Sequence, residues 1–384
     1  MTLQFRQTPH DMLPRPSHDE DSRQDYVLSL RLHLSRHVSP GAVTVYDKRV
    51  KPAFEKANGR LPKDGHEVRK VMTKDSTYQL WSFMQGESQR QMWSSTIDTI
   101  ERTLPDTLAR ARGKRQLGTL RLDPNLEIPA YHTAYDIHQQ PGGYHTDVLP
   151  DDIAEGLVYD MSVPIYAMGM MGPENDASGE TCINYFKTMY AGRSPDRVLD
   201  MGCTIGNSTI PWAKHFPDAE VYGLDVGAPC LRYGHARANA MGVAIHLSQQ
   251  DAAKTDFPDD HFDVVTSSLM FHETSTTAAP AIFEECYRIL KPGGVMIHWD
   301  AWRTETPEPI REFLGSWEAY NNNEHFLAKM MSMDHISGAV NAGFARKNVR
   351  IERTPFVKSV AINSESSKGY MGGFGEVPVF VAEK

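Results

Sequence analysis

The sequence predicts an α/β protein with a doubly wound, seven-stranded, mostly parallel sheet, preceded by a mainly helical N-terminal domain. From residue 197 onward, short β-branched runs alternate with helical segments, as in parallel strands joined by crossover helices. From residue 25 to about 117, apolar residues recur at the three- and four-residue steps of a helix. The 384 residues also exceed the roughly 100–200 usual for one domain.

The elements of the predicted sheet follow one another at regular intervals. Seven short apolar runs are the strand candidates, at residues 197–201, 220–224, 244–247, 262–267, 295–299, 349–355 and 377–382. Helices are predicted between them at residues 208–215, 229–241, 279–290 and 335–342.

The chain divides into three predicted parts. Residues 1–24 mix proline, histidine, aspartate and arginine and are typical of a disordered or loosely packed start. Residues 25–155 predict a helical domain that ends in a lid-like loop, and residues 156–384 predict the domain built on the sheet. The region 117–171 consists of short, irregular pieces rich in proline, glycine, tyrosine and histidine, which is a loop composition.

Composition excludes several classes of protein. The formal charge of -9 gives no general attraction to nucleic acid or to anionic lipid. No window approaches the roughly 18 apolar residues of a membrane span, and no secretory signal precedes the helical region. The four cysteines form no CxxC pair, which predicts a reducing, cytoplasmic location.

The stretch from residue 197 to 210 is the most informative motif. An apolar strand ends at the acidic Asp200, and Gly202 and Gly206 then lie in a turn that opens a helix. Glycine allows the backbone to approach a ligand closely, and the helix start offers unpaired N–H groups. The dinucleotide fingerprint G-x-G-x-x-G is not matched, because Thr204 stands at the middle glycine. This departure argues against NAD or FAD.

Two further acidic residues follow predicted strands. Asp225 ends the second strand, where a carboxylate can accept hydrogen bonds from the two hydroxyls of a ribose. Asp251 comes just after the third strand and is placed to accept a hydrogen bond from an exocyclic amine such as that of adenine, with the N–H of Ala252 available to a ring nitrogen. The sequence therefore predicts a ligand that contains a ribose.

These blocks, together with the Lys-Pro-Gly-Gly turn at residues 291–294, resemble the class I S-adenosylmethionine-dependent methyltransferases, especially the group similar to the quinone methyltransferases. The resemblance is strong over residues 194–290 and looser to residue 384, and the first ~190 residues match no known family. Thr204 stands where the family commonly has glycine. This difference is expected to affect only the detailed fit around the amino-acid part of the cofactor. The resemblance implies S-adenosylmethionine as the cofactor, bound by Asp200, Gly202, Thr204, Gly206, Asp225, Val226, Asp251, Ala252 and Ser267.

The function implied is methyl transfer to a small-molecule acceptor, with oxygen, nitrogen, sulfur and carbon all open as the acceptor atom. A binding or scaffold module without turnover is one alternative, and an NAD-dependent oxidoreductase is another. No nucleic-acid or membrane partner is expected, and the helical extension suggests a homodimer.

Catalytic candidates come from the loops at the carboxyl ends of the strands and from the lid-like loop. His272 follows the fourth strand and is the first candidate for a base or an acceptor-orienting group; local hydrogen bonding is the alternative. His138 and Tyr144 lie in the lid-like loop, where they either face the acceptor or pack structurally. His33 and His37 have a metal-compatible spacing without a third ligand, and no metal site is expected.

Overall fold

The computed structural model describes residues 7–113, 116–357 and 375–384. One sheet of eight strands organises the C-terminal part, in the order β1-β4-β3-β2-β5-β6-β8-β7. All neighbouring strands are parallel except β8, which runs antiparallel to both β6 and β7. The strands are β1 (Gly118–Arg121), β2 (Arg197–Met201), β3 (Glu220–Asp225), β4 (Ile245–Gln249), β5 (Phe262–Ser268), β6 (Leu290–Trp299), β7 (Val349–Pro355) and β8 (Glu376–Glu383).

The order of the strands reverses beside β2. From β2 the chain moves outward through β3 to β4 and then returns to β5 on the other side of β2. Such a reversal separates the loops that follow the two neighbouring strands, and ligands of open α/β sheets bind at the carboxyl edge at this point. The loops after β2, β3, β4 and β5 therefore define the place to look for a site.

The prediction of seven strands was one short, because the sheet has an additional strand, β1. It pairs in parallel with the outer edge of β4, from Gly118 opposite Ile245 to Arg121 opposite Ser248. The run Gly-Thr-Leu-Arg carries little apolar periodicity, since an edge strand is held mainly by its backbone hydrogen bonds. The seven strands expected from the sequence are all present, with ends shifted by a few residues.

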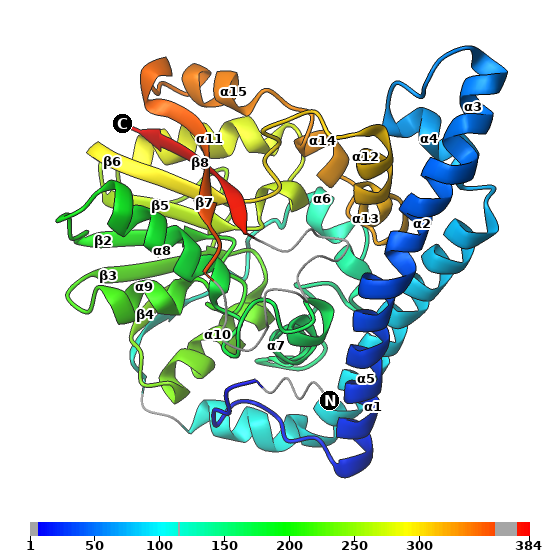
Figure 1. Ribbon diagram of the computed structural model, residues 1–384. Coiled ribbons are helices and arrows are strands. Elements are labelled where there is room, and N and C mark those ends of the chain that lie inside the picture. Colours follow the sequence, from blue (N-terminus) through cyan, green and yellow to red (C-terminus); the bar gives the residue numbers. More distant parts are fainter. Residues whose placement is uncertain (1–6, 114–115, 358–374) are drawn as a thin grey trace.

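Helices cover both faces of the sheet (Figure 1). Successive strand residues point to opposite faces, so Val198 and Val264 pack in one apolar cluster and Leu199 and Val265 in another. The first cluster includes residues of α8 (Ala177–Met189) and α9 (Thr209–His215), and the second includes residues of α11 (Ala278–Ile289) and α15 (His335–Asn341).

The N-terminal helices pack beside this layered unit. Figure 1 shows α1 and α5 running alongside each other. They share an apolar cluster with α7 and α10, in which Tyr233 of α10 is fully buried. A smaller cluster joins α2, α4 and α5 to α12 and α13. The helices are α1 (His18–His33), α2 (Ser39–Val45), α3 (Lys51–Asn58), α4 (Gly65–Met72), α5 (Ser76–Arg112), α6 (Ala130–Thr133), α7 (Ala154–Tyr166), α10 (Ala228–Ala240), α12 (Pro309–Gly315), α13 (Trp317–Asn321) and α14 (Leu327–Met330). Shorter helical turns are η1 (Leu34–Val38), η2 (Tyr46–Val50), η3 (Ile137–Gln139), η4 (Phe271–Glu273) and η5 (Arg346–Asn348).

The expected loose start is wrong for the end of the segment 1–24, because α1 already begins at His18. Ser17 accepts a hydrogen bond from the N–H of Glu20 and donates its own N–H to the Glu20 carboxylate, which is a capping box. Met12, before the helix, is fully buried. Residues 1–6 lie outside the described residues.

The expectation of irregular structure throughout residues 117–171 also needs correction, because it contains the 13-residue helix α7. Gly156 of this helix lies against Tyr233 of α10, and a Cβ at Gly156 would come within 2.4 Å of the Tyr233 Cβ. Close packing on α10, rather than an amphipathic stripe, holds this helix in place. Among the described residues, no helix has the length and apolarity needed to cross a membrane.

Candidate functional site

The turn after β2 brings backbone groups to the carboxyl edge of the sheet. Gly202 and Gly206 adopt positive φ angles of 66° and 76°. A Cβ at Gly202 would lie 2.7 Å from the Met270 Cγ, so this position has room only for glycine. Thr204 also has a positive φ, 48°, which is strained for a β-branched residue. We call residues 202–206 the glycine loop.

Asp200 anchors the start of the glycine loop from inside the protein. Its Oδ2 accepts hydrogen bonds from the hydroxyls of Ser208 (2.7 Å) and Thr209 (2.6 Å). Its Oδ1 is buried and accepts no hydrogen bond from the described residues. Burial raises the pKa of this carboxyl to about 6, against the effect of the two hydroxyls. An unused acceptor at this place fits a ligand that brings a hydrogen-bond donor.

Asp225 lies at the tip of β3 and is fixed by two backbone groups. Its Oδ2 accepts the N–H of Thr204 and its Oδ1 accepts the N–H of Gly227, both at 2.9 Å. A carboxylate has about four acceptor positions, so each oxygen keeps one for a ligand. Burial raises the pKa of Asp225, partly offset by these hydrogen bonds. The expected ribose-binding geometry is therefore compatible with the structure.

The remaining predicted cofactor residues occupy neighbouring loops. The Val226 carbonyl accepts a hydrogen bond from Gln249 Nε2 at 3.0 Å. Asp251 follows β4, where its Oδ1 accepts the N–H of Ala253 at 2.8 Å, and Ala252 is 9% exposed. Burial and the charges of Asp251 and Asp225 raise the pKa of the Tyr131 phenol.

Ser267 is the predicted cofactor residue whose side chain is engaged elsewhere. It is fully buried in β5, and its hydroxyl is 2.8 Å from Nδ1 of His298 in β6. Burial lowers the pKa of His298 to about 3, so this histidine is a neutral core residue.

His272 is held by an aspartate from the next strand. Its Nδ1 lies 2.7 Å from Asp300 Oδ1, and its backbone N–H donates to Asp300 Oδ2 at 3.2 Å. Burial favours the neutral imidazole, but the charge of Asp300 outweighs it and raises the pKa of His272 to about 9. Because Asp300 engages Nδ1, the ring nitrogen left for another partner is Nε2.

His138 comes from the N-terminal region and joins His272. Its Nε2 lies 3.1 Å from Glu273 Oε1, and its Nδ1 lies 3.0 Å from Glu324 Oε1. Burial lowers the pKa of His138, but the charges of Glu324 and Glu273 outweigh it and raise the pKa well above its usual value. We call His138, His272, Glu273, Asp300 and Glu324 the histidine cluster.

The segment from residue 130 to 146 connects the two groups of residues. At one end, His132 partly offsets the raised pKa of Asp225. At the other end, His138 contacts Glu273. Between them the Tyr144 carbonyl accepts from Cys230 Sγ at 3.3 Å and lies where a side chain at Gly227 would clash. Tyr144 is 8% exposed, and burial raises the pKa of its phenol.

The chain is similar to known methyltransferases over the residues that carry the glycine loop. Residues 198–294 match the model of a methyltransferase domain family. A phosphoethanolamine N-methyltransferase 3 of Arabidopsis thaliana is 32% identical over 29% of this chain and 23% of its own. The ubiquinone/menaquinone biosynthesis C-methyltransferase UbiE of Neisseria meningitidis is 35% identical over 27% of this chain and 41% of its own. A demethylmenaquinone methyltransferase of Thermus thermophilus is 31% identical over 27% and 47%.

The chain contains a class I S-adenosylmethionine-dependent methyltransferase domain. The chain spans less than half the length of each of these curated relatives. Among solved structures, a phosphoethanolamine N-methyltransferase 2 of Haemonchus contortus is 18% identical, with a TM-score of 0.39 over 53% of this chain and 52% of that one. A structure described as that of a sarcosine dimethylglycine methyltransferase of Galdieria sulphuraria is 15% identical. Its TM-score is 0.38 over 54% of this chain and 84% of that one.

Sequence reasoning missed part of what surrounds the methyltransferase domain's glycine loop. Glu324 lies in an Asn-rich connection far from any motif, and only packing brings it to His138. Tyr131 belongs to the irregular region, yet the charges of the strand-tip acids Asp225 and Asp251 raise the pKa of its phenol. The pairing of Asp300 with His272 could not be predicted from the spacing of the two residues in the sequence.

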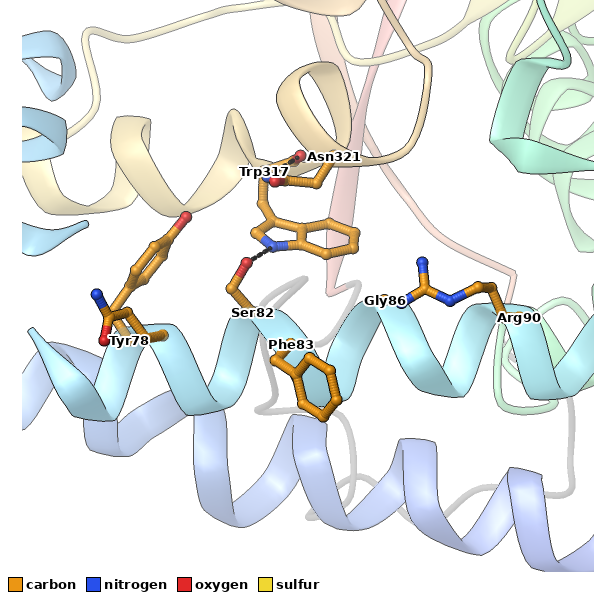
Figure 2. A pocket seen from close by; sticks show the side chains of 8 residues that line it. Tyr78, Ser82, Phe83, Gly86, Arg90, Trp317 and Asn321 are labelled. Carbon is orange, nitrogen blue, oxygen red and sulfur yellow. Dashed lines mark hydrogen bonds between the residues drawn. The ribbon is translucent and has the colours of Figure 1, made fainter. Parts of the chain in front are cut away.

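A separate groove lies away from these residues (Figure 2). It runs between α5 and α13, where Trp317 Nε1 donates to the Ser82 hydroxyl at 2.8 Å. None of the predicted site residues lines it, and its lining lacks a carboxylate or an imidazole. The candidate site of the methyltransferase domain is therefore the carboxyl edge of the sheet and not this groove.

Proposed function

We propose that this protein transfers a methyl group from S-adenosylmethionine to a small-molecule acceptor at the carboxyl edge of its sheet. The main support is the position of the glycine loop and Asp225 next to the histidine cluster. Met270 packs on Gly202 and is only two residues before His272. The cofactor, when bound, supplies a methyl group activated by a positively charged sulfur.

The residues of the glycine loop and strand tips are suited to hold that cofactor. Asp225 offers acceptors for the two ribose hydroxyls, and Asp251 with Ala252 offers a polar edge for adenine. Gly202 and Gly206 leave the backbone open to close approach at the helix start. Asp200 contributes an unused buried acceptor below the loop. This donor and acceptor set supports an adenosyl ligand.

The histidine cluster is suited to the acceptor side. Buried polar groups that are fixed by hydrogen bonds orient a second reactant, and positioning of two reactants can contribute roughly 7–11 kcal/mol. His272 is fixed by Asp300 and His138 by Glu324, so neither ring is free to turn. The segment 130–146 contacts Glu273 through His138 and Cys230 through the Tyr144 carbonyl, which supports a role for it in keeping water from the acceptor.

A small acceptor is supported by two observations. The similar proteins are named for phosphoethanolamine and for quinone precursors, which are small molecules. The acidic balance of the chain, with a formal charge of -9, does not suit a nucleic-acid acceptor.

Calorimetry with S-adenosylhomocysteine tests the proposal. The wild-type chain should bind it, and Asp225→Ala should bind it more weakly. Asp218→Ala is the matched control, because Asp218 is exposed in the turn before β3, at the other edge of the sheet, and should leave binding unchanged. No binding at millimolar ligand, or displacement by NADH, would contradict the proposal. Binding without turnover on a broad acceptor panel would point to a scaffold instead.

A further inference from the structure

We infer that His138, His272 and Glu273 bind one divalent transition-metal ion, Zn²⁺ by the type of its donors, at the acceptor side of the site. The ion would take an ionisable hydroxyl or thiol as a further ligand; this last step rests on the proposed function. No metal was expected from the sequence, since the two histidines are 134 residues apart by their numbers.

The donor atoms already lie close together. One ring nitrogen of each histidine and one oxygen of Glu273 lie within 4.8 Å of one another. Atoms bound to one zinc ion at about 2.0–2.1 Å are about 3.0–3.5 Å apart. His138 Nε2 and Glu273 Oε1, at 3.1 Å, already have such a separation. The Glu273 side chain is partly exposed and can shift toward an ion held by the two rings.

Both histidines carry the support that metal ligands have in known sites. A ligating imidazole usually donates its other N–H to a carboxylate, which fixes its tautomer and orientation. Asp300 holds Nδ1 of His272 at 2.7 Å, and Glu324 holds Nδ1 of His138 at 3.0 Å. This arrangement occurs at both rings, although they come from separate parts of the chain, and it leaves both Nε2 atoms for one shared partner.

The charge of the cluster also favours a cation. The three carboxylates outnumber the two imidazoles, so the cluster keeps a net negative charge even when both rings are protonated. The supporting carboxylates are the most deeply buried, with side chains 0% (Asp300) and 5% (Glu324) exposed. Buried negative charge without a balancing cation is costly, and a divalent ion offsets it.

Exposure shows where a further ligand would enter. The Glu273 side chain is 21% exposed and that of His138 is 16% exposed, so the donor side of the cluster is reachable. Two histidines and one carboxylate occupy three positions, which leaves at least one position open, as in zinc sites that bind a reactant. A hydroxyl or thiol that binds there gives up its proton to solvent near neutral pH.

Zinc binding to the full chain tests this inference. After treatment with a chelator, the wild-type protein is titrated with Zn²⁺ against a competing chromophoric chelator, and Co²⁺ is added separately to record visible absorption. We expect one tight site per chain. His138→Ala should lower the affinity at least ~100-fold, and Glu324→Gln, which removes the charge paired with His138 Nδ1, by roughly 10–100-fold.

Two variants keep the test decisive. Glu273→Gln changes a partly exposed side chain and should fold normally, so it tests the site even if a histidine variant fails to fold. The double variant His33→Ala/His37→Ala is the matched control, because these exposed histidines have rings 5.0 Å apart on the N-terminal helices and should not contribute. Loss of zinc only in this double variant, or no stoichiometric binding by wild type, overturns the inference.

Calorimetry on the same samples separates this inference from the proposed function. S-Adenosylhomocysteine binding without stoichiometric zinc would overturn the metal site and leave methyl transfer standing. Zinc binding that depends on His138, without S-adenosylhomocysteine binding, would support the metal site and contradict methyl transfer.

Discussion

The glycine loop and the histidine cluster lie side by side but are built differently. The glycine loop presents backbone groups, and the acids Asp200 and Asp225 come from the consecutive strands β2 and β3 that flank it. The histidine cluster presents charged side chains from four separate places: η3, η4, the end of β6 and the connection after α13. The proposed cofactor site is therefore made from neighbouring elements, whereas the proposed acceptor site depends on long-range packing.

The largest effect is expected at Glu155, which holds the segment 130–146 through Gln140. Gln140 Nε2 donates to Glu155 Oε2 at 2.8 Å, and burial raises the pKa of Glu155 to about 8. At a pH below the usual pKa of a glutamate, Glu155 is protonated in both the folded and the unfolded chain, so the shift does not change the free energy of unfolding. As the pH rises toward 8, the unfolded chain loses its proton first, so the folded protein loses stability, on the order of a few kcal/mol.

Glu155→Gln should therefore remove this pH dependence and unfold a few degrees higher than wild type at pH 9. Thermal unfolding from pH 5 to 9 measures it, with the exposed Glu284→Gln as control. Hydrogen exchange should show the segment 130–146 opening before the glycine loop at high pH in wild type. Equal opening of both regions would contradict the claim that Glu155 acts mainly on the segment 130–146.

Asp225→Ala addresses the cofactor side. Loss of a charged hydrogen-bond acceptor should cost roughly 1.5–3 kcal/mol of binding free energy for S-adenosylhomocysteine. The loop that it fixes through Thr204 should loosen, while the spectrum of bound Co²⁺ at the histidine cluster should stay unchanged. Calorimetry and absorption on one sample measure both, and a changed Co²⁺ spectrum would mean that the two regions are not separable.

Asp300→Asn addresses the acceptor side. The asparagine keeps the size of the side chain but no longer provides the charge that fixes His272. Turnover should fall by roughly 10–100-fold, as for other carboxylates that position a histidine. The dissociation constant of S-adenosylhomocysteine should change little, and a loss of similar size in both measurements would contradict a role limited to the acceptor side.

Thr204→Gly should have the smallest effect. Thr204 has a φ of 48°, which costs a residue with a Cβ about 1–2 kcal/mol. Glycine relieves this strain but has greater freedom in the unfolded chain, so a net gain of about 0.5–1 kcal/mol is expected over Thr204→Ala, which keeps the Cβ. Denaturant unfolding of both variants measures the difference; equal stability would remove the argument for strain.

The parts of this protein that could be predicted from its sequence are those encoded by neighbouring residues. The seven strands, the turn from Asp200 to Gly206 and the acid at Asp225 follow from apolar runs and glycine spacing, because each depends on residues a few positions apart. The edge strand β1 and the helix α7 were missed, because pairing with β4 and packing on Tyr233 outweigh their weak local patterns.

Sequence by itself determined that this chain contains a methyltransferase domain and where the glycine loop lies. His272 was predicted from its place after a strand and His138 from its loop, yet no spacing could show that donor atoms of both rings and of Glu273 lie within 4.8 Å of one another. Only the tertiary structure decided that Asp300 and Glu324 stand behind them. The physical reason is that charge pairs between distant segments have no periodicity and no fixed separation, so they come into being only when the core packs.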